Sequence, residues 1–250
     1  MSHDAKSVLI TGSGHGIGKA AARHLAARGW TVGINDLKEE FVAEAVAEIE
    51  AAGGTAIPVV QNVSTRDGVE AAVATLVAAT GRLDGLVNNA AWVRYQAIPD
   101  IAPETVERML NIGFSGVIWG IQAAAAAMDD ARGGTIVNVA SAAGFRSPAN
   151  SLVYSGIKAG VMGMTRAAAV ELGARNIRVN AVAPSAIPTE GTAKHRNAER
   201  DAKRIADTPL GRLGTVDDIA RAISYLMNDE SDFVTGQVLS SDGGIGIAIT

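Results

Sequence analysis

Short apolar runs alternate with helical patterns along the chain of 250 residues, and this alternation restricts the fold more than any other feature. Strands joined through helices imply a parallel sheet with helices on both faces. No break in composition marks a second domain. The sequence therefore predicts an α/β fold in which residues 1–250 form a single doubly wound domain. The expected strands of its parallel seven-stranded sheet are 7–11, 31–35, 55–60, 83–87, 135–140, 177–182 and 237–239.

Helical patterns fill the stretches between these strands. The longest, 104–131 and 151–172, contain the uncharged runs 113–128 and 159–165. A helix that is apolar on all sides needs cover on both, and a sheet covers only one of them. We therefore expect a homo-oligomer, specifically a homotetramer; the alternative is that the chain's own loops cover these helices. The remaining helices are expected at 20–27, 37–52, 65–80 and 216–227.

Composition and charge exclude several classes of protein. With a net charge of -4, the chain has no electrostatic basis for binding nucleic acid or an anionic membrane. It has no cysteine, and its four histidines lack metal-ligand spacing, so we expect no disulfide and no metal site. The apolar stretch 112–128 contains three glycines and is more typical of a buried helix than of a membrane span. We expect a cytoplasmic protein without a signal segment.

A glycine-rich turn follows the first predicted strand and opens a helix, with the pattern Thr-Gly-x-x-x-Gly-x-Gly over residues 11–18. Positions without side chains let the backbone approach a pyrophosphate, and the start of the helix offers free N–H groups. Any tight connection between a strand and a helix can use such a turn, so its position in the fold carries the argument. The candidate cofactor-binding residues in this turn are Gly12, Ser13, His15, Gly16, Ile17 and Gly18.

An acidic residue ends the second predicted strand, beside the first. The carboxylate of Asp36 could accept hydrogen bonds from a ribose diol, and it would repel a 2′-phosphate. Leu37 follows it, and the glycine-rich turn contains no lysine or arginine. The alternative is an ordinary solvated aspartate at a strand end. We therefore expect NAD as the cofactor rather than NADP.

A tyrosine and a lysine lie four residues apart in the predicted helix 151–172. On a helix, Tyr154 and Lys158 would project side by side from one face. A free tyrosine titrates near pH ~10, and a neighbouring cation favours its phenolate form, which suits a general acid/base. The same spacing also occurs by chance on helix surfaces, so this pair needs support from the rest of the chain.

Together, the glycine-rich turn, Asn88-Asn89-Ala90-Ala91, Ser141 and the Tyr154–Lys158 pair resemble the short-chain dehydrogenase/reductase family over essentially the whole chain. The resemblance implies a Rossmann-like fold and hydride transfer between a nicotinamide and a small secondary alcohol or ketone. Tyr154 would be the general acid/base, and Lys158 would lower its pKa and hold the nicotinamide ribose. Ser141 would hydrogen-bond the substrate oxygen.

The resemblance also implies cofactor contacts outside the glycine-rich turn. These are the adenine side at Asn62 and Val63, the ribose side at Leu37, Asn89 and Ala90, and the nicotinamide side at Pro184, Ile187 and Thr189. One departure affects the active site: Gly113 stands where the family usually has an asparagine that supports a kinked helix and a water leading from the lysine. We expect this to reduce the rate without removing the reaction.

The segment 184–209 is expected to form a substrate lid, and it is rich in charges of both signs. Its cations suggest an anionic substrate, but the acids among them make a solvated amphipathic helix the better interpretation. These cations are Lys194, His195, Arg196, Arg200, Lys203 and Arg204. By resemblance, the crevice is flanked by side chains that could hold a carboxylated or acyl-thioester substrate. These candidate substrate residues are Arg94, Tyr95 and Arg146.

Two alternatives to an NAD-dependent alcohol dehydrogenase or ketoreductase remain open. A 3-oxoacyl-thioester reductase of the same family usually prefers NADPH, which fits Asp36 poorly. A dinucleotide-sensing protein without catalysis is possible on the same fold. Such proteins tend to lose the tyrosine or the lysine, whereas Tyr154 and Lys158 are both present here.

Overall fold

The computed structural model describes residues 5–191 and 197–248. All seven strands of the sheet pair in parallel, in the order β3-β2-β1-β4-β5-β6-β7. The predicted α/β fold with a parallel seven-stranded sheet is confirmed. The strands are β1 (Ser7–Ile10), β2 (Thr31–Asp36), β3 (Thr55–Val60), β4 (Gly85–Asn88), β5 (Gly134–Val139), β6 (Ile177–Pro184) and β7 (Val238–Ser241).

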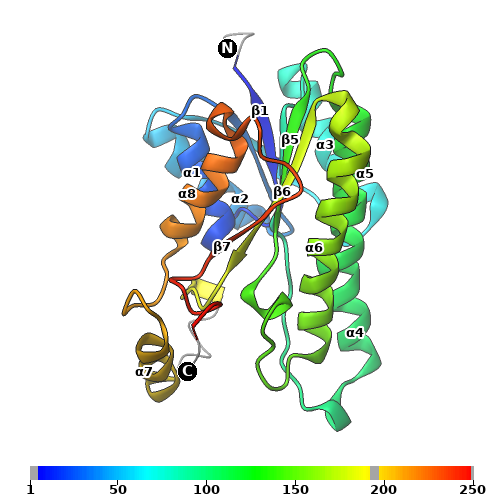
Figure 1. Ribbon diagram of the computed structural model, residues 1–250. Coiled ribbons are helices and arrows are strands. Elements are labelled where there is room, and N and C mark those ends of the chain that lie inside the picture. The colour runs from blue at the N-terminus through cyan, green and yellow to red at the C-terminus, as the bar shows by residue number, and fades with distance from the viewer. Residues whose placement is uncertain (1–4, 192–196, 249–250) are drawn as a thin grey trace.

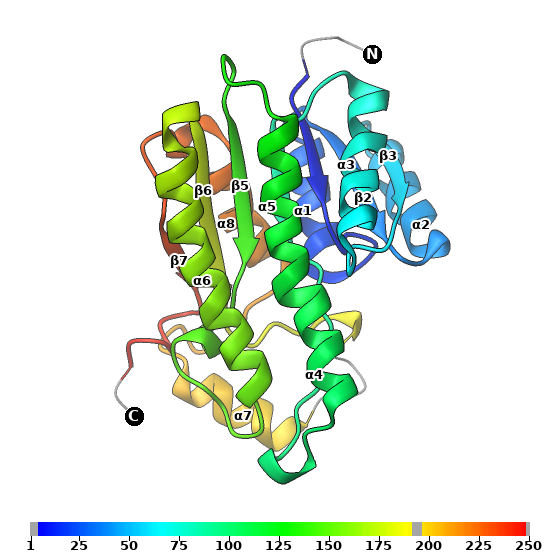
Figure 2. The same cartoon turned by 90° about the vertical axis from the view of Figure 1, so that its right-hand side faces the viewer.

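Helices cover both faces of this sheet (Figure 1), with α1, α2 and α8 on one face and α3, α5 and α6 on the other. The helices are α1 (Gly16–Ala26), α2 (Glu39–Ala51), α3 (Arg66–Thr80), α4 (Pro103–Leu110), α5 (Gly116–Ala127), α6 (Leu152–Leu172), α7 (Ala198–Asp207) and α8 (Val216–Met227). Figures 1 and 2 both place α7 beyond the carboxyl ends of the strands, where a crevice forms in such sheets.

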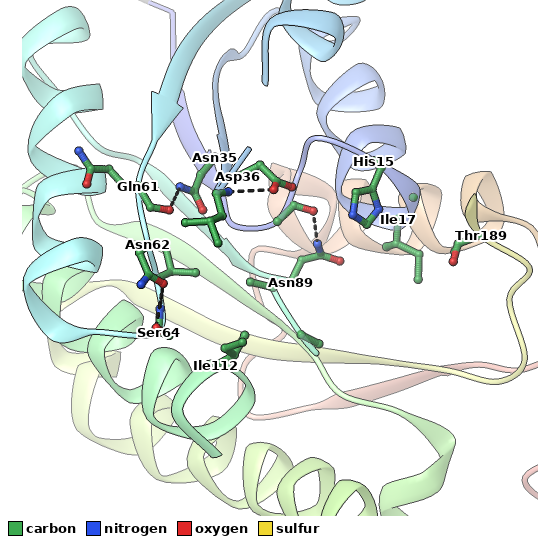
Figure 3. Close-up of a pocket in the computed structure, with 16 residues that line it drawn as sticks. His15, Ile17, Asn35, Asp36, Gln61, Asn62, Ser64, Asn89, Ile112 and Thr189 are labelled. Carbon is green, nitrogen blue, oxygen red and sulfur yellow. Dashed lines mark hydrogen bonds between the residues drawn. The ribbon is translucent and has the colours of Figure 1, made fainter. Parts of the chain in front are cut away.

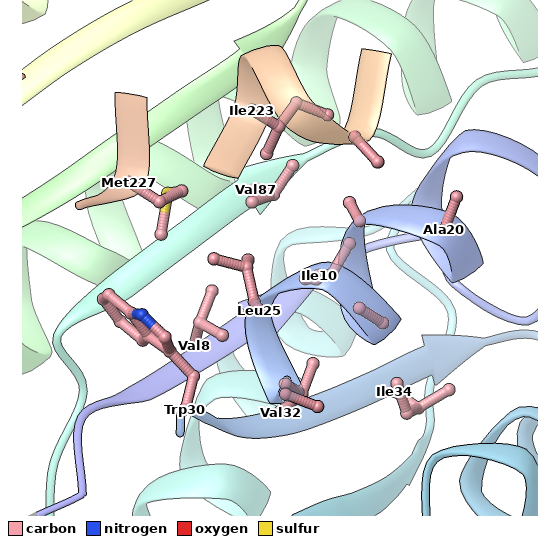
Figure 4. Packing of buried hydrophobic residues seen from close by; sticks show 14 of the residues in the cluster. Val8, Ile10, Ala20, Leu25, Trp30, Val32, Ile34, Val87, Ile223 and Met227 are labelled. Atoms are coloured by element: carbon pink, nitrogen blue, oxygen red, sulfur yellow. The ribbon is translucent and has the colours of Figure 1, made fainter. Parts of the chain in front are cut away.

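Strand β1 contains an uninterrupted apolar run because both of its faces are buried. Side chains alternate between the two faces of a strand, and both faces are covered here. Ile10 packs toward α1 and α8, where it joins Leu25 and Ile223 in a fully buried cluster (Figure 4). Leu9 belongs to the cluster on the opposite face, with Ile136 of β5. The two clusters fix the sheet between its helical layers.

The helix predicted as one unit over 104–131 is interrupted. A π-helical turn, Asn111–Ser115, separates α4 from α5. Such a turn adds a residue to the helix and therefore shifts every following side chain relative to a 3.6-residue period. By length and composition, the stretch Pro103–Ala127 could cross a membrane, but core helices of soluble proteins pass the same test. Here α5 packs on α3, α6 and β4.

The strand order reverses between β1 and β4, and hydrogen bonds tie the two strand ends together. The hydroxyl oxygen of Thr11 accepts the backbone N–H groups of Asn89 and Ala90, each at 3.0 Å. The side-chain amide of Asn89 donates to the carbonyl oxygens of Thr11 and Gly12, each at 2.9 Å. In doubly wound sheets, ligands bind at this reversal point. The hydrogen bonds of Thr11 and Asn89 therefore fix the geometry of this reversal point.

Candidate active site

A cavity of about 290 Å³ opens at the carboxyl ends of β1, β2, β3 and β4 (Figure 3). It collects most of the residues that the sequence assigned to a cofactor: Gly12, His15, Gly16, Ile17, Asp36, Leu37, Asn62, Val63, Asn89, Ala90 and Thr189. It also includes residues that were not predicted: Asn35, Gln61, Ser64, Ala91 and Ile112.

The unpredicted residues differ in whether the sequence held a signal for them. Gln61 follows β3 directly and Asn35 precedes the last residue of β2, so the rule that strand ends line the crevice could have found both. Ile112 comes from the π-helical turn, which the helical pattern did not reveal.

The glycine-rich turn brings its backbone close to neighbouring strands. Gly12 has a φ of +61°, and a Cβ atom there would lie 2.9 Å from the Cα of Ala90. A Cβ on Gly18 would lie 2.5 Å from the carbonyl oxygen of Gly12. Both positions therefore require glycine, the first for the turn and the second for the packing of α1 against β1.

Two predicted cofactor contacts in this turn, Ser13 and Gly18, lie behind the wall of the cavity. Ser13 is fully buried; its hydroxyl donates to the carbonyl oxygen of Ile10 at 2.7 Å and accepts the N–H of Asn35 at 3.0 Å. Gly18 faces inward against Gly12. Neither residue lines the cavity. They hold the shape of the turn instead: the Ser13 hydroxyl joins the ends of β1 and β2, and Gly18 lets α1 pack closely on Gly12.

Asp36 lies at the predicted place, at the end of β2. One carboxylate oxygen accepts the backbone N–H of Leu37 at 2.8 Å and that of Lys38 at 3.3 Å. The other oxygen is directed at the glycine-rich turn, 2.9 Å from where a Cβ on Gly14 would stand. The ammonium of Lys38 lies 4.8 Å from the ring centroid of Phe41. The hydrogen bonds from Leu37 and Lys38 hold the Asp36 carboxylate in a fixed position on the wall of the cavity.

Asn35 offers a direct test of what the cavity can hold. Its side chain is fully buried, and its amide nitrogen donates to the carbonyl oxygens of Val59 and Gln61 at 3.0 and 3.1 Å. Its amide oxygen has no partner among the described residues. A buried acceptor without a donor is costly, so it suits a ligand that brings an N–H or O–H group. With the open glycine-rich turn and the carboxylate of Asp36, these groups fit an adenine dinucleotide.

Ser141, Tyr154 and Lys158 meet beyond this cavity. Ser141 follows β5; its hydroxyl oxygen accepts the N–H of Ala143 at 3.1 Å, and its side chain is hydrogen-bonded to Tyr154. Lys158 is buried in α6, and its ammonium donates to the carbonyl oxygen of Val139 at 2.6 Å. The same nitrogen lies 5.8 Å from the ring centroid of Tyr154. Strand β5 and the first turns of α6 therefore bring the three predicted side chains together.

The electrostatics of this cluster differ from the sequence-based expectation. Burial raises the pKa of Tyr154 to about 12, although the hydrogen bond with Ser141 lowers it, and the nearby Tyr95 adds to the rise. Burial also lowers the pKa of Lys158 to about 8. Lys158 is not among the groups that lower the pKa of Tyr154 here, because its ammonium is directed at Val139 and burial of the phenol dominates. The phenol is protonated at neutral pH.

The three candidate substrate residues fare differently. The ring of Tyr95 meets that of Tyr154 edge to face, with 5.8 Å between the centroids. Arg94 instead lines a separate narrow pocket. Arg146 donates to the backbone carbonyl groups of Ile245 and Ala248 and so contacts the C-terminal segment; its assignment to a substrate stays a prediction. Only Tyr95 contacts the cluster directly.

Helix α7 approaches the same cluster. Burial raises the pKa of Tyr95, whereas Arg204 and Arg200 of α7 lower it. These two guanidinium groups therefore lie near enough to act on the Tyr95 hydroxyl. The predicted lid cations Lys194, His195 and Arg196 lie outside the described residues.

Of the three residues predicted to contact the nicotinamide, one lines the cavity. Pro184 ends β6 and is buried, and Ile187 packs so closely that a Cβ on Gly214 would lie 2.4 Å from its Cδ1 atom. Neither Pro184 nor Ile187 lines the cavity, and their assignment to the nicotinamide stays a prediction. Thr189 does line it. Beside Thr189, the carboxylate of Glu190 accepts the backbone N–H of Gly16 at 3.1 Å.

Known proteins match this chain over nearly its whole length. A family model described as enoyl-(acyl carrier protein) reductase matches residues 12–246. A 3-oxoacyl-[acyl-carrier-protein] reductase of Thermotoga maritima is 40% identical over 247 residues, which is 99% of this chain and 100% of that protein. The BbsD subunit of (2S)-[(R)-hydroxy(phenyl)methyl]succinyl-CoA dehydrogenase from Thauera aromatica is 39% identical over 237 residues, 94% of each chain.

A solved structure shows the same architecture. The gluconate 5-dehydrogenase of Burkholderia cenocepacia, crystallised with NADP and tartrate, superposes with a TM-score of 0.93 at 33% identity, covering 98% of this chain and 97% of that one. The extent of these matches confirms the resemblance drawn from the sequence. The chain belongs to the short-chain dehydrogenase/reductase family, whose members are oxidoreductases that use NAD or NADP.

Proposed function

We propose that this chain is an NAD(H)-dependent oxidoreductase that interconverts a small secondary alcohol and its ketone, with Tyr154 as the general acid/base. One observation carries the proposal: Ser141, Tyr154 and Lys158 converge at the carboxyl edge of the sheet, next to a cavity whose donors and acceptors fit an adenine dinucleotide. A proton donor and a cofactor cavity at one edge suit hydride transfer coupled to proton transfer.

The protonation states supply the groups that ketone reduction needs at neutral pH. With its pKa raised to about 12, Tyr154 holds the proton that a ketone oxygen must receive. Ser141 would hydrogen-bond that oxygen and orient it toward Tyr154. Lys158, with its pKa lowered to about 8, is mostly an ammonium at pH 7 and would stabilise the phenolate left behind. When bound, the nicotinamide supplies or accepts the hydride.

The choice of NAD rests on Asp36. Its carboxylate is fixed on the cavity wall by two backbone N–H groups, where it can accept from a ribose diol and would repel a 2′-phosphate. Asn62 and Val63 would flank the adenine, and Asn89 with Ala90 would face the ribose on the nicotinamide side. Tyr95 would contact the substrate.

A second candidate is a 3-oxoacyl-thioester reductase that uses NADPH. The similarity to the Thermotoga maritima reductase supports it, as does the NADP in the gluconate 5-dehydrogenase structure. Comparing NADH with NADPH on a panel that includes simple ketones and a 3-oxoacyl thioester would separate the candidates. Turnover of the thioester with NADPH alone would favour the second.

We also propose a cytoplasmic homotetramer in which residues 184–209 cover the substrate. Exposed apolar side chains support association, since a second copy would remove them from water. Val170 of α6 is 86% exposed, Ile118 of α5 is 38% exposed and Phe233 is fully exposed. Sedimentation analysis of the purified protein would test this proposal.

The catalytic assignment is tested by Tyr154→Phe, with Tyr225→Phe of the exposed surface of α8 as the matched control. Loss of the proton donor should reduce the rate of ketone reduction by about 10²- to 10⁴-fold, with NADH binding retained. The absorbance of NADH reports turnover, and its fluorescence reports binding. Full activity in Tyr154→Phe would refute the assignment, as would an equal loss in Tyr225→Phe.

A further inference from the structure

The start of helix α1 is capped from a distant part of the chain. The carboxylate of Glu190 accepts the N–H of Gly16, the first residue of α1, at 3.1 Å. Glu190 lies 174 positions further along the chain, next to Thr189, and a Cβ on Gly16 would stand 3.5 Å from the Cγ2 atom of Thr189. The segment that carries Glu190 therefore rests directly on the glycine-rich turn.

Helix α1 supplies no such cap itself. Its N-cap residue, His15, makes no side-chain hydrogen bond to the helix, and its first turn contains no acidic residue. The first N–H groups of a helix lack intrahelical partners and carry a partial positive charge, so they attract an anion. Glu190 provides this anion for the N–H of Gly16. Gly16 also lines the cavity.

We propose that Glu190 is a latch that competes with the dinucleotide's pyrophosphate for the N–H of Gly16. This inference rests on the proposed placement of the cofactor in the cavity. The N–H can be held by one anion at a time, and two anions at the same helix start repel each other. Dinucleotide binding therefore displaces the Glu190 carboxylate from the N–H of Gly16.

The latch lowers the affinity for the dinucleotide. A protein whose binding-competent state is only partly populated shows a weaker apparent affinity in proportion. Since a single charge at a helix start has a modest effect, removing it should lower the dissociation constant of NADH by about two- to fivefold. The gain should be found in the association rate, because the latch must open before the pyrophosphate is bound.

The test compares Glu190→Ala and Glu190→Gln with the unaltered protein. Glu171→Gln, an exposed position near the end of α6, is the control for net charge. The probes are NADH, ADP-ribose and adenosine, with dissociation constants from calorimetry and association rates of NADH from stopped-flow fluorescence. We expect Glu190→Ala to bind NADH and ADP-ribose more tightly and adenosine equally well. Glu190→Gln should be intermediate, because its amide can still accept the N–H without a charge.

Several results would overturn the latch. These are unchanged dissociation constants in both Glu190 variants, an equal gain for adenosine, an equal gain in Glu171→Gln, or a gain found entirely in the dissociation rate. Failure of the proposed cofactor placement gives a different result, because the unaltered protein would then bind neither NADH nor ADP-ribose.

Discussion

Replacing the buried Lys158 with methionine should change how the stability of the protein depends on pH. The ammonium lies in a fully desolvated position, and burial lowers its pKa from 10.5 to about 8. At about 1.4 kcal/mol per pKa unit, this difference corresponds to about 3 kcal/mol of folding free energy. Methionine has a similar length and no charge, so Lys158→Met removes this penalty.

The sign of the effect follows from proton binding. Because the folded pKa lies below the unfolded one, the penalty of the wild-type protein is fully present below pH ~8 and disappears as the pH rises to ~10.5. Between these values the unfolded chain holds a proton that the folded chain has lost. The stability advantage of Lys158→Met over the wild type should therefore shrink by about 3 kcal/mol from pH 7 to pH 10.5.

Urea unfolding of both proteins from pH 7 to pH 10.5, without cofactor and at one protein concentration, measures this difference. Lys203→Met serves as the control, because the Lys203 side chain is 77% exposed. Its stability relative to the wild type should show no comparable fall over this range. A constant difference between Lys158→Met and the wild type would refute the reasoning, since it would show that burial does not penalise the ammonium.

Two further predictions concern the cofactor cavity and the π-helical turn. Asp36→Ala should improve NADPH binding relative to NADH by about tenfold or more, because a like-charge repulsion with the 2′-phosphate is removed. Fluorescence titration measures the two dissociation constants, and an unchanged ratio between them would contradict the role of Asp36. Gly113→Ala should stabilise the protein by about 0.5–1 kcal/mol, since alanine restricts the unfolded chain. A Cβ at Gly113 has its nearest neighbour, the Cγ2 atom of Ile157, at 3.4 Å. Thermal melting tests this, and a lower melting temperature would contradict it.

The sequence was sufficient for the architecture because the architecture depends on periodic burial. Strand 55–60 and helix 216–227 were placed at their observed bounds, and the other predicted strands and helices coincide with observed ones with shifted ends. Asp36 and the Tyr154–Lys158 pair were found because strand ends and helix faces have fixed positions in such a fold. These rules are local, and they need no knowledge of the side chains that pack around them.

The remaining features depend on packing between distant segments. The π-helical turn Asn111–Ser115 breaks the period on which helix prediction relies. Ser13 faces inward because the turn directs it there, which spacing alone cannot show. The pKa of Tyr154 depends on burial by its surroundings, and the contact of Glu190 with Gly16 joins segments without any shared sequence signal.

The hydrogen bonds of Thr11 and Asn89 across the strand reversal have a consequence for protein engineering. They fix the distance between the ends of β1 and β4 through groups of those two strand ends. In the described parts of this segment, 184–191 and 197–209, the Glu190 side chain contacts the glycine-rich turn. Grafting a different 184–209 segment from a relative should therefore change substrate choice without rebuilding the rest of the domain, which makes this molecule a suitable host for loop exchange.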